Sequence, residues 1–409
     1  MNRKDRLRFR VLVGSYAAST FGSYLNMVAL NLFVFEATGS AFATGLFMVL
    51  RMVCGFVAGL LGGVIAARLP RKAVMISCDV VQAVVLLVFA VVSHAARLQM
   101  LPVVAVSIGL LSTTSTVMLR SSVPDLVGAE HRQQANGALV TGRAAAMVLG
   151  FASGGVLVSW LGYQAAFAVN AGTFAVSALT LMVLALPFAK RDVETGEHTG
   201  YRTRLRLTML ALAAAPAVLA IVVIRAVDAF GSASHQVGTP IYATQIQPDN
   251  PASFAGNFYA AWAVGLFTAH LLMKRLHREP GEVGAEKAFV LGTALMSAAF
   301  IVSFAAIPQP WVLLIIAVAG VADGVTEITY TTRVQAEPEP ARGYFFGLTA
   351  MAENAGLGIG IVLAGGLLET WSPVAVAGLM HGLVVLLALG YLLLVLARRK
   401  PRVDELAGS

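Results

Sequence analysis

The stretch GALVTGRAAAMVLGFASGGVL, residues 137–157, aligns without gaps on the stretch GLTAMAENAGLGIGIVLAGGLL, which begins at Gly347. A second pair repeats at a similar separation, with RLPR at 68–71 and RLHR at 275–278. Each pair is separated by about half of the 409 residues. The chain is therefore a tandem repeat whose two halves run in the same direction.

The composition shows what kind of repeat this is. Hydrophobic residues make up 58% of the chain and charged residues only 12%, whereas soluble domains average about 25% charged residues. A helix needs roughly 20 mostly apolar residues to cross a bilayer. The sequence predicts a polytopic membrane protein with twelve spans, at about 11–35, 41–66, 74–94, 100–120, 136–158, 164–187, 209–240, 254–273, 287–306, 311–332, 344–368 and 373–397.

The basic residues predict how these spans are oriented. Of the 29 lysines and arginines, all but four fall at the termini or in or beside the connections on one side of the predicted membrane. The exceptions are Arg97 in a connection on the other side and Arg51, Arg143 and Arg225 within spans. Basic residues accumulate on the cytoplasmic side of membrane proteins. We therefore expect both termini in the cytoplasm, and we attribute the net charge of +8 to topology rather than to nucleic-acid binding.

The only long polar connection divides the chain near its midpoint. We predict an N-terminal six-helix bundle at 1–187, a cytoplasmic linker at 188–208 and a C-terminal six-helix bundle at 209–409. The fold class is an all-α membrane protein of two pseudo-symmetric bundles. Parallel repeats of this kind are an architecture of secondary transporters, whose substrate site lies near the midplane between the repeats.

A motif after the second span resembles a known family. In GGVIAARLPRK, residues 62–72, four residues match the signature G-x-x-x-D-R-x-G-R-[KR] of the major facilitator superfamily: Gly63, Arg68, Arg71 and Lys72. Ala67 replaces the signature aspartate and Pro70 its glycine. The resemblance covers essentially all twelve spans and implies a gate latch on the cytoplasmic side. The role of the missing aspartate is expected to pass to Asp79.

Two further stretches indicate a branch of that family. AMVLGFASGG, residues 146–155, is similar to an antiporter motif, although Ala146 and Phe151 depart from it; ordinary packing of small residues is the alternative interpretation. The stretches at 51–79 and 119–139 resemble drug and siderophore exporters of the macrolide-efflux and enterobactin-exporter type. The resemblance implies export of a small molecule across the cytoplasmic membrane of a bacterium.

The stretch AIVVIRAVDAF, residues 220–230, places two charges inside an apolar span. Arg225 and Asp228 are three residues apart and share one face of a helix, so they can pair. Charges at the centre of a span are rare and mark ion pathways or structural pairs. We predict that Asp228 carries a proton and that Arg225 adjusts its affinity; the alternative is a structural ion pair.

The tenth span carries a second acidic pair in VADGVTEITYTTR, residues 321–333. Asp323 and Glu327 are four residues apart, so two acids share one face within the membrane, which favours a bound proton. Arg333 is predicted to pair with Glu327. The alternative interpretation is a salt-bridged inner gate.

Several other charges are predicted to belong to gates. Arg143 and Glu353 occupy the same position of the repeat, and Arg51 is expected to face Glu353. Arg120 and Asp79 lie near the predicted cytoplasmic edge and are expected to be close together. The predicted proton-coupling set is Asp228, Arg225, Asp323, Glu327 and Glu353. The predicted gate set is Arg51, Gly63, Arg68, Arg71, Lys72, Asp79, Arg120, Arg143 and Arg333.

Polar and aromatic residues in the first, fourth and seventh spans are predicted to line a cavity. They are Tyr16, Tyr24, Asn26, Thr113, Phe230 and His235. Hydroxyl groups in membrane helices also bond their own backbone, and a buried histidine is often structural, so these assignments compete with simple packing.

These features predict a proton-coupled exporter that works by alternating access on a bulky amphipathic natural product, such as an antibiotic, a siderophore or a modified peptide. The alternatives are an importer of a small polar solute, a lipid flippase or a non-transporting sensor or scaffold. The sequence contains no P-loop pattern and no catalytic constellation. We therefore expect no enzymatic activity, no cofactor and no metal, with protons, the substrate and the lipid bilayer as the partners of a monomer.

Overall fold

The computed structural model describes residues 3–38, 41–184, 216–249, 251–275, 282–338 and 341–397, and the predicted linker at 188–208 lies outside them. Every regular element within these ranges is helical. The long helices are α1 (Arg3–Thr38), α2 (Ala41–Arg68), α3 (Arg71–Val91), α4 (His94–Ser107), α5 (Thr113–Val127), α6 (Arg132–Val183), α8 (Pro216–Ile246), α9 (Pro251–Arg275), α10 (Glu282–Ser303), α11 (Gln309–Gln335), α12 (Ala341–Leu368) and α13 (Pro373–Ala397).

The described helices confirm the predicted membrane fold. Eleven segments are long and apolar enough to span a bilayer. The eighth predicted span, 254–273, lies within α9, a helix of 25 residues that is not among those eleven. The fifth predicted span and the described part of the sixth up to Val183 lie in α6, where the chain turns at Gly162, whose φ of 78° favours glycine. The fourth is longer than predicted, because one turn of π-helix, Ile108–Ser112, joins α4 to α5 into a continuous segment.

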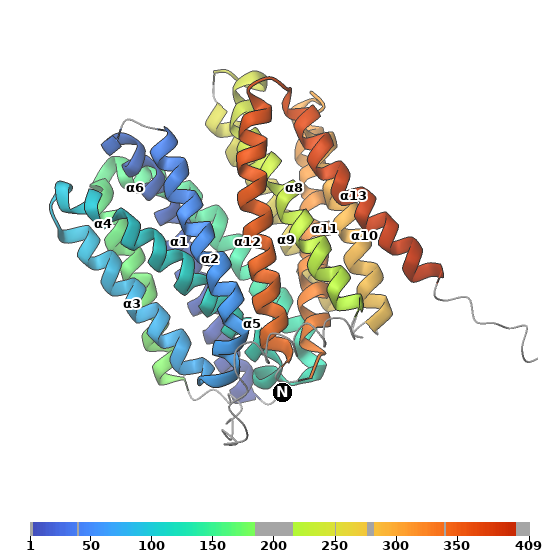
Figure 1. Ribbon diagram of the computed structural model, residues 1–409, viewed down its shortest axis with the longest axis horizontal. Helices are drawn as coiled ribbons and strands as arrows, with labels where there is room; N and C mark the ends of the chain where they lie inside the picture. Colours follow the sequence, from blue (N-terminus) through green and yellow to red (C-terminus); the bar gives the residue numbers. More distant parts are fainter. Residues whose placement is uncertain are drawn as a thin grey trace, which may run out of the picture.

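The helices form two groups that lie side by side, with α1–α6 in one and α8–α13 in the other (Figure 1). We call these the N-half and the C-half. The end of the bundle where α1 begins is the near side, and the opposite end is the far side. The halves meet along two seams, where α2 packs against α12 and α6 packs against α9.

Glycines allow the first seam to be tight. A Cβ atom on Gly59 of α2 would lie 2.7 Å from the carbonyl oxygen of Gly347 on α12. The predicted gate residue Gly63 packs against Tyr344 in the same way, so a side chain there would meet the Tyr344 backbone at 2.6 Å. Small residues at a helix crossing let two backbones approach closely inside a membrane.

Replacing Gly59 with valine is therefore expected to destabilise the protein. The added side chain forces α2 away from α12, and overpacking of this kind costs about 1–3 kcal/mol. The measurement is the Tm of the purified protein in detergent. Gly365→Val is the matched control, because nothing lies within 4 Å of a Cβ atom at that glycine on the same helix pair. Equal Tm values for the two variants would contradict the tight seam.

Candidate functional site

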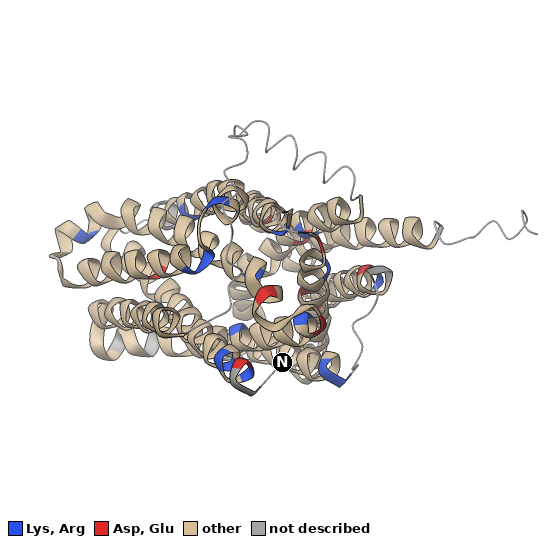
Figure 2. Ribbon diagram, turned by 90° about the horizontal axis from the view of Figure 1, so that it is seen from below, with Lys and Arg blue, Asp and Glu red and all other residues tan. Residues whose placement is uncertain are grey.

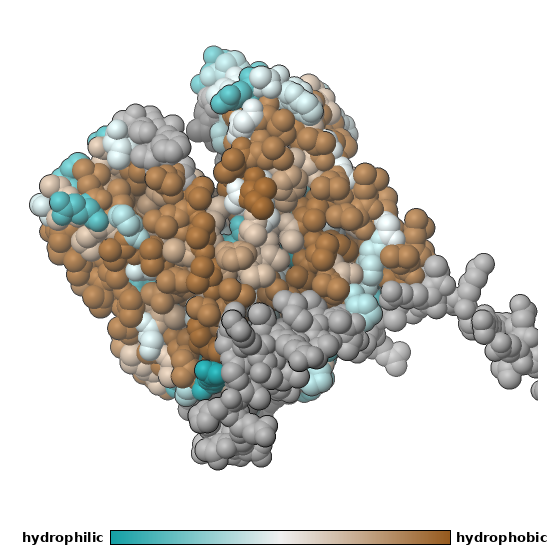
Figure 3. Space-filling view, viewed as in Figure 1, coloured by the Kyte–Doolittle hydropathy of each residue, from teal (hydrophilic) through white to brown (hydrophobic). Residues whose placement is uncertain are grey.

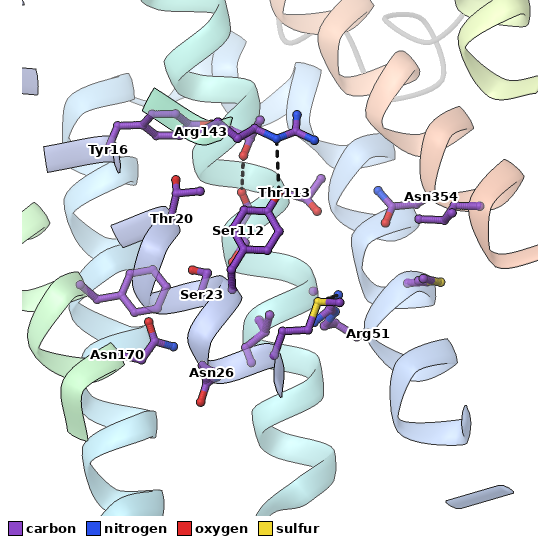
Figure 4. A pocket seen from close by; sticks show the side chains of 18 of the residues that line it. Tyr16, Thr20, Ser23, Asn26, Arg51, Ser112, Thr113, Arg143, Asn170 and Asn354 are labelled. Atoms are coloured by element: carbon purple, nitrogen blue, oxygen red, sulfur yellow. Dashed lines mark hydrogen bonds between the residues drawn. The ribbon is translucent and has the colours of Figure 1, made fainter. Parts of the chain in front are cut away.

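A cavity of about 330 Å³ lies in the N-half, against the interface with the C-half. Its walls come from α1, α2, the segment joining α4 to α5, α5 itself and α6, while Asn354 of α12 faces it from the other half (Figure 4). Tyr16, Thr20 and Ser23 recur at helical spacing on one face of α1, and so they all point into the cavity. The predicted cavity residues Tyr16, Tyr24, Asn26 and Thr113 all line it.

A second cavity of about 300 Å³ lies against the C-half, and the two cavities have four lining residues in common: Arg120, Arg143, Asn354 and Leu357. We call the pair the central cavity. His235 lines its C-half part, stacked on Phe300 at 3.9 Å and with its Nδ1 3.2 Å from Nε2 of His381. Phe230 does not line either part. It packs instead against the apolar cluster of Ala233, Ala364, Val376 and Met380.

Arg225 is the centre of a buried charge cluster in this cavity. Its guanidinium lies 2.7 Å from Glu353, 2.9 Å from Glu327 and 3.3 Å from Asp228. The predicted contact between Arg225 and Asp228 is thus present. The face of Tyr330 lies 5.0 Å from the same guanidinium and adds a cation–π contact.

Glu327 connects the two halves through this cluster. One carboxylate oxygen accepts a hydrogen bond from Arg225 of the C-half, and the other accepts one from Arg120 of the N-half at 2.5 Å. Figure 2, viewed from the near side, shows charged segments along the helices at the centre of the bundle while most of the remaining ribbon is uncharged. A change in the charge of Glu327 therefore acts on both halves at once.

Two acids of the cluster are incompletely paired. The Oδ1 atom of Asp228 is buried and has no hydrogen-bond partner in the described structure. Asp323 lines the C-half part of the cavity, and the described residues give it no ion pair. A buried carboxylate oxygen without a partner is costly to keep charged.

Three predicted contacts are wrong. Arg333 does not pair with Glu327, because six residues correspond to one and two-thirds helical turns and place the two side chains on different faces. Arg333 instead pairs with Glu286 and Glu337. Arg51 does not face Glu353; its guanidinium lies 3.7 Å from the sulfur of Met27.

The third wrong contact joins Arg120 to Asp79. Arg120 reaches across to Glu327 and lines the central cavity, so it is not at the edge of the bundle. Asp79 is buried in a separate small cavity within the N-half, with Ser15 and Gln82 among its lining residues. Asp79 therefore does not replace the missing aspartate of the signature.

Asp125, which the sequence reasoning missed, occupies the latch. One of its oxygens lies 2.9 Å from Arg71 of the N-half and the other 3.2 Å from Arg342 of the C-half. The remaining basic residues of the signature have other roles, since Lys72 donates to the carbonyl of Leu184 at 2.9 Å and Arg68 is exposed. Asp125 lies within the stretch at 119–139, the one that resembles the exporters.

Side-chain amides close the near side beside this latch. The amide nitrogen of Asn136 donates to Thr332 at 3.0 Å and to Gln335 at 2.9 Å, and Gln335 donates to the carbonyl of Arg120. Gln133 donates to the carbonyl of Met273 at 3.1 Å. On the far side the space-filling view shows a hollow between the halves (Figure 3). The molecule is therefore closed at its near side and open towards its far side.

The comparisons with known proteins agree with this architecture. A sequence model of the Major Facilitator Superfamily matches residues 12–341. The structure of the human organic anion transporter MFSD10 (TETRAN) is similar at a TM-score of 0.75 and 16% identity, covering 95% of this chain and 99% of that one. The transporter FucP in its outward conformation is similar at a TM-score of 0.74 and 13% identity, covering 94% of this chain and 99% of that one. A second structure of FucP, the E. coli fucose:proton symporter, has the same TM-score at 14% identity, covering 94% and 98%. A search of curated proteins gave no significant match.

Proposed function

Because this chain belongs to the major facilitator superfamily, we propose that it is a secondary active exporter that exchanges protons for a bulky amphipathic natural product. The protein is a multi-pass membrane protein with the transporter fold. The direction of transport, the substrate and the coupling ion are the proposed parts. The charge cluster supports the choice of ion, the topology supports the direction, and the cavity supports the substrate class.

The observation that carries the proposal is the charge cluster. Four carboxylates, those of Asp228, Asp323, Glu327 and Glu353, share the buried site with the guanidinium groups of Arg120, Arg143 and Arg225. Two of these acids, Asp228 and Asp323, are incompletely paired, so the group offers a site for a proton. The proton enters from the far side, where the hollow lies, and binds at Asp228, whose Oδ1 lacks a partner.

Coupling follows from the bridge at Glu327. When an acid of the cluster gains a proton, fewer negative charges compete for Arg225. The ion pair between Arg225 and Glu327 then strengthens, and the ion pair between Glu327 and Arg120 of the N-half weakens. Weakening that bridge favours opening of the near side. A ligand shifts such an equilibrium only by its different affinity for the two states, and here the proton makes that difference.

The topology supports export. The near side carries the basic signature residues Arg68, Arg71 and Lys72, and we assign it to the cytoplasm by the positive-inside rule. The open far side then faces outwards, which is the state that releases an exported substrate and takes up a proton. We place the protein in the cytoplasmic membrane of a bacterium, with both termini in the cytoplasm.

The lining of the cavity supports an amphipathic cargo. Aromatic residues such as Tyr16, Phe174 and Phe300 line the cavity together with hydroxyl and amide groups such as those of Ser112 and Asn354. A surface of this kind binds an apolar body and a few polar groups together. One of the similar structures is that of an organic anion transporter, and the likeness at 16% identity concerns the fold alone.

The test begins with a susceptibility panel of macrolides, siderophores and modified peptides in cells with and without the gene. The uptake of the compound identified is then measured in inverted membrane vesicles under an imposed pH gradient. Asp228→Asn and Glu327→Gln are each expected to lower pH-gradient-driven uptake by about tenfold or more, because the proton site or the bridge is lost. The control variant is Glu130→Gln, whose side chain is 69% exposed on the near side.

A second assay separates coupling from folding. Substrate counterflow needs no pH gradient, so Asp228→Asn is expected to retain it while losing gradient-driven uptake. The proposal is wrong if both variants keep full gradient-driven uptake. It is equally wrong if Asp228→Asn loses counterflow and gradient-driven uptake to the same degree, because the residue would then be structural.

A further inference from the structure

The seam between α2 and α12 opens into an apolar groove towards the far side. Among the described residues, those lining a cavity of about 700 Å³ all belong to these two helices, and they include Val49, Val53 and Phe56 of α2 and Ile359 and Val362 of α12. The side chains that line it are apolar apart from Asn354. Figure 3 shows this face of the molecule, with hydrophobic surface on both sides of a hollow in which polar surface is visible.

The glycines along the seam show that the helices diverge. On the near half of the seam, a Cβ atom at Gly59 or Gly63 would meet backbone of α12. At Gly358 the nearest contact has lengthened to 3.7 Å, to the sulfur of Met52, and at Gly365 and Gly366 nothing lies within 4 Å. The groove is therefore a wedge, closed on the near side and widening towards the far side.

Two residues connect the wedge to the central cavity. Met52 lines both the groove and the N-half part of the cavity, and Asn354 lines the groove and both parts of the cavity. The outer walls of the groove face the region of the lipid chains, because Ile359 is 64% and Val362 is 66% exposed on helices that span the membrane. A flexible chain can thus lie in the groove while the group attached to it lies in the cavity.

The cavity beside this junction carries two guanidinium groups whose direct contacts are with uncharged side chains. The Arg51 guanidinium contacts the sulfur of Met27, and that of Arg143 lies 3.4 Å from the Tyr24 hydroxyl. Neither has an ion pair within the part of the chain that the structure describes. Burying a charge without its counter-ion is costly, so a bound anion stabilises both side chains.

Taking these observations together, we infer that the substrate is an anionic amphiphile. Its acidic group binds between Arg51 and Arg143 while its aliphatic chain occupies the groove between α2 and α12. The substrate passes through this groove to the outer half of the bilayer. This inference rests on the proposed export function and specifies its substrate class. The groove supplies apolar surface for the chain and the two arginines supply complementary charge for the head.

The test measures equilibrium binding of three fluorescent probes to the full chain in detergent. The probes are a long-chain dansylated fatty acid, its uncharged methyl ester and a short dansylated amino acid that has the anion without the chain. The fatty acid is expected to bind most tightly. Arg51→Gln and Arg143→Gln are each expected to lower the binding affinity for both anionic probes by about tenfold, and the ester is expected to bind weakly to every variant.

Filling the groove tests the role of the chain. Val362→Trp is expected to lower the binding affinity for the fatty acid about tenfold and to leave the affinity for the short anion unchanged. Leu386→Trp is the matched control, because Leu386 is 70% exposed on α13, a spanning helix that does not line the groove. If Val362→Trp and Leu386→Trp have the same effect, the groove holds only bilayer lipid and the inference is wrong. It is also wrong if the ester binds as tightly as the acid.

The readouts separate this inference from the proposed function. Binding in detergent requires no pH gradient, so tight binding of the fatty acid without gradient-driven transport would overturn proton-coupled export and leave the substrate class standing. Gradient-driven export of a compound from the panel without binding of the fatty acid would overturn the substrate class alone.

Discussion

Replacing Arg225 with methionine is expected to lower the stability of the protein by about 3–5 kcal/mol, the cost of removing one partner from a buried ion pair. The substitution keeps an unbranched apolar stem and removes a guanidinium that lies within 3.3 Å of Asp228, Glu327 and Glu353. Glu327 keeps Arg120 as a partner, but Asp228 and Glu353 are left without one. The measurement is the Tm of the purified protein at neutral pH.

Two further variants show whether charge is the cause. Adding Asp228→Asn and Glu353→Gln to Arg225→Met removes the stranded charges and is expected to recover most of the lost stability. Arg225→Lys is expected to fall between the wild type and Arg225→Met, because a lysine ammonium cannot reach several acids with the geometry of a guanidinium. A Tm for Arg225→Met equal to that of the wild type would contradict the cluster, and a triple variant no more stable than Arg225→Met would attribute the loss to packing.

The spans were predictable because a bilayer imposes one simple requirement on each of them. A run of about 20 apolar residues identifies a crossing helix without any knowledge of its neighbours. The prediction fell short where the local backbone decides, as at the π-turn that continues α4 into α5. This feature has no hydropathy signal.

Contacts within one helix were predictable, whereas contacts between helices were not. Arg225 and Asp228 meet because their spacing fixes their relative position on α8. The spacing of Arg333 and Glu327 on α11 also excludes their pairing, because six residues at about 3.6 per turn place the two side chains on different faces of the helix. The bridge from Glu327 to Arg120 depends on the rotation and depth of two helices in different halves, which a single sequence does not specify.

The same limit explains why Asp125 was missed. The signature motif directs attention to residue 67, where the family has an acid and this chain has alanine. The acid that serves Arg71 lies more than fifty residues further along, at the near end of α5. The chemistry of the latch is therefore retained while the residue that supplies its negative charge comes from another helix.

Replacing Asp125 with asparagine is expected to open the near side. The change preserves size but removes the charge that holds Arg71 and Arg342 together, and hydrogen bonds to charged groups contribute about 1.5–3 kcal/mol. The ratio of open to closed molecules should then rise roughly ten- to hundredfold. The measurement is the distribution of distances between spin labels at Leu69 in the N-half and Lys274 in the C-half, both exposed near-side residues.

The labels are attached to cysteines in a background where Cys54 and Cys78 are replaced by alanine. Glu130→Gln is the control, because this acid lies five residues beyond Asp125 and is 69% exposed, so its loss should leave the distances unchanged. The prediction is wrong if Asp125→Asn gives the distribution of the control. It is also wrong if Glu130→Gln opens the near side equally, since the effect would then belong to surface charge.

A second pair of labels distinguishes alternating access from simple loosening. Trp160 of the N-half and Trp371 of the C-half are both exposed at the far side. If the halves rock about the central cavity, the near-side distance lengthens in Asp125→Asn and the far-side distance shortens in the same molecules. Lengthening at the near side without shortening at the far side would mean that Asp125 only fastens the halves together. The charge cluster would then be the remaining element able to link the two sides.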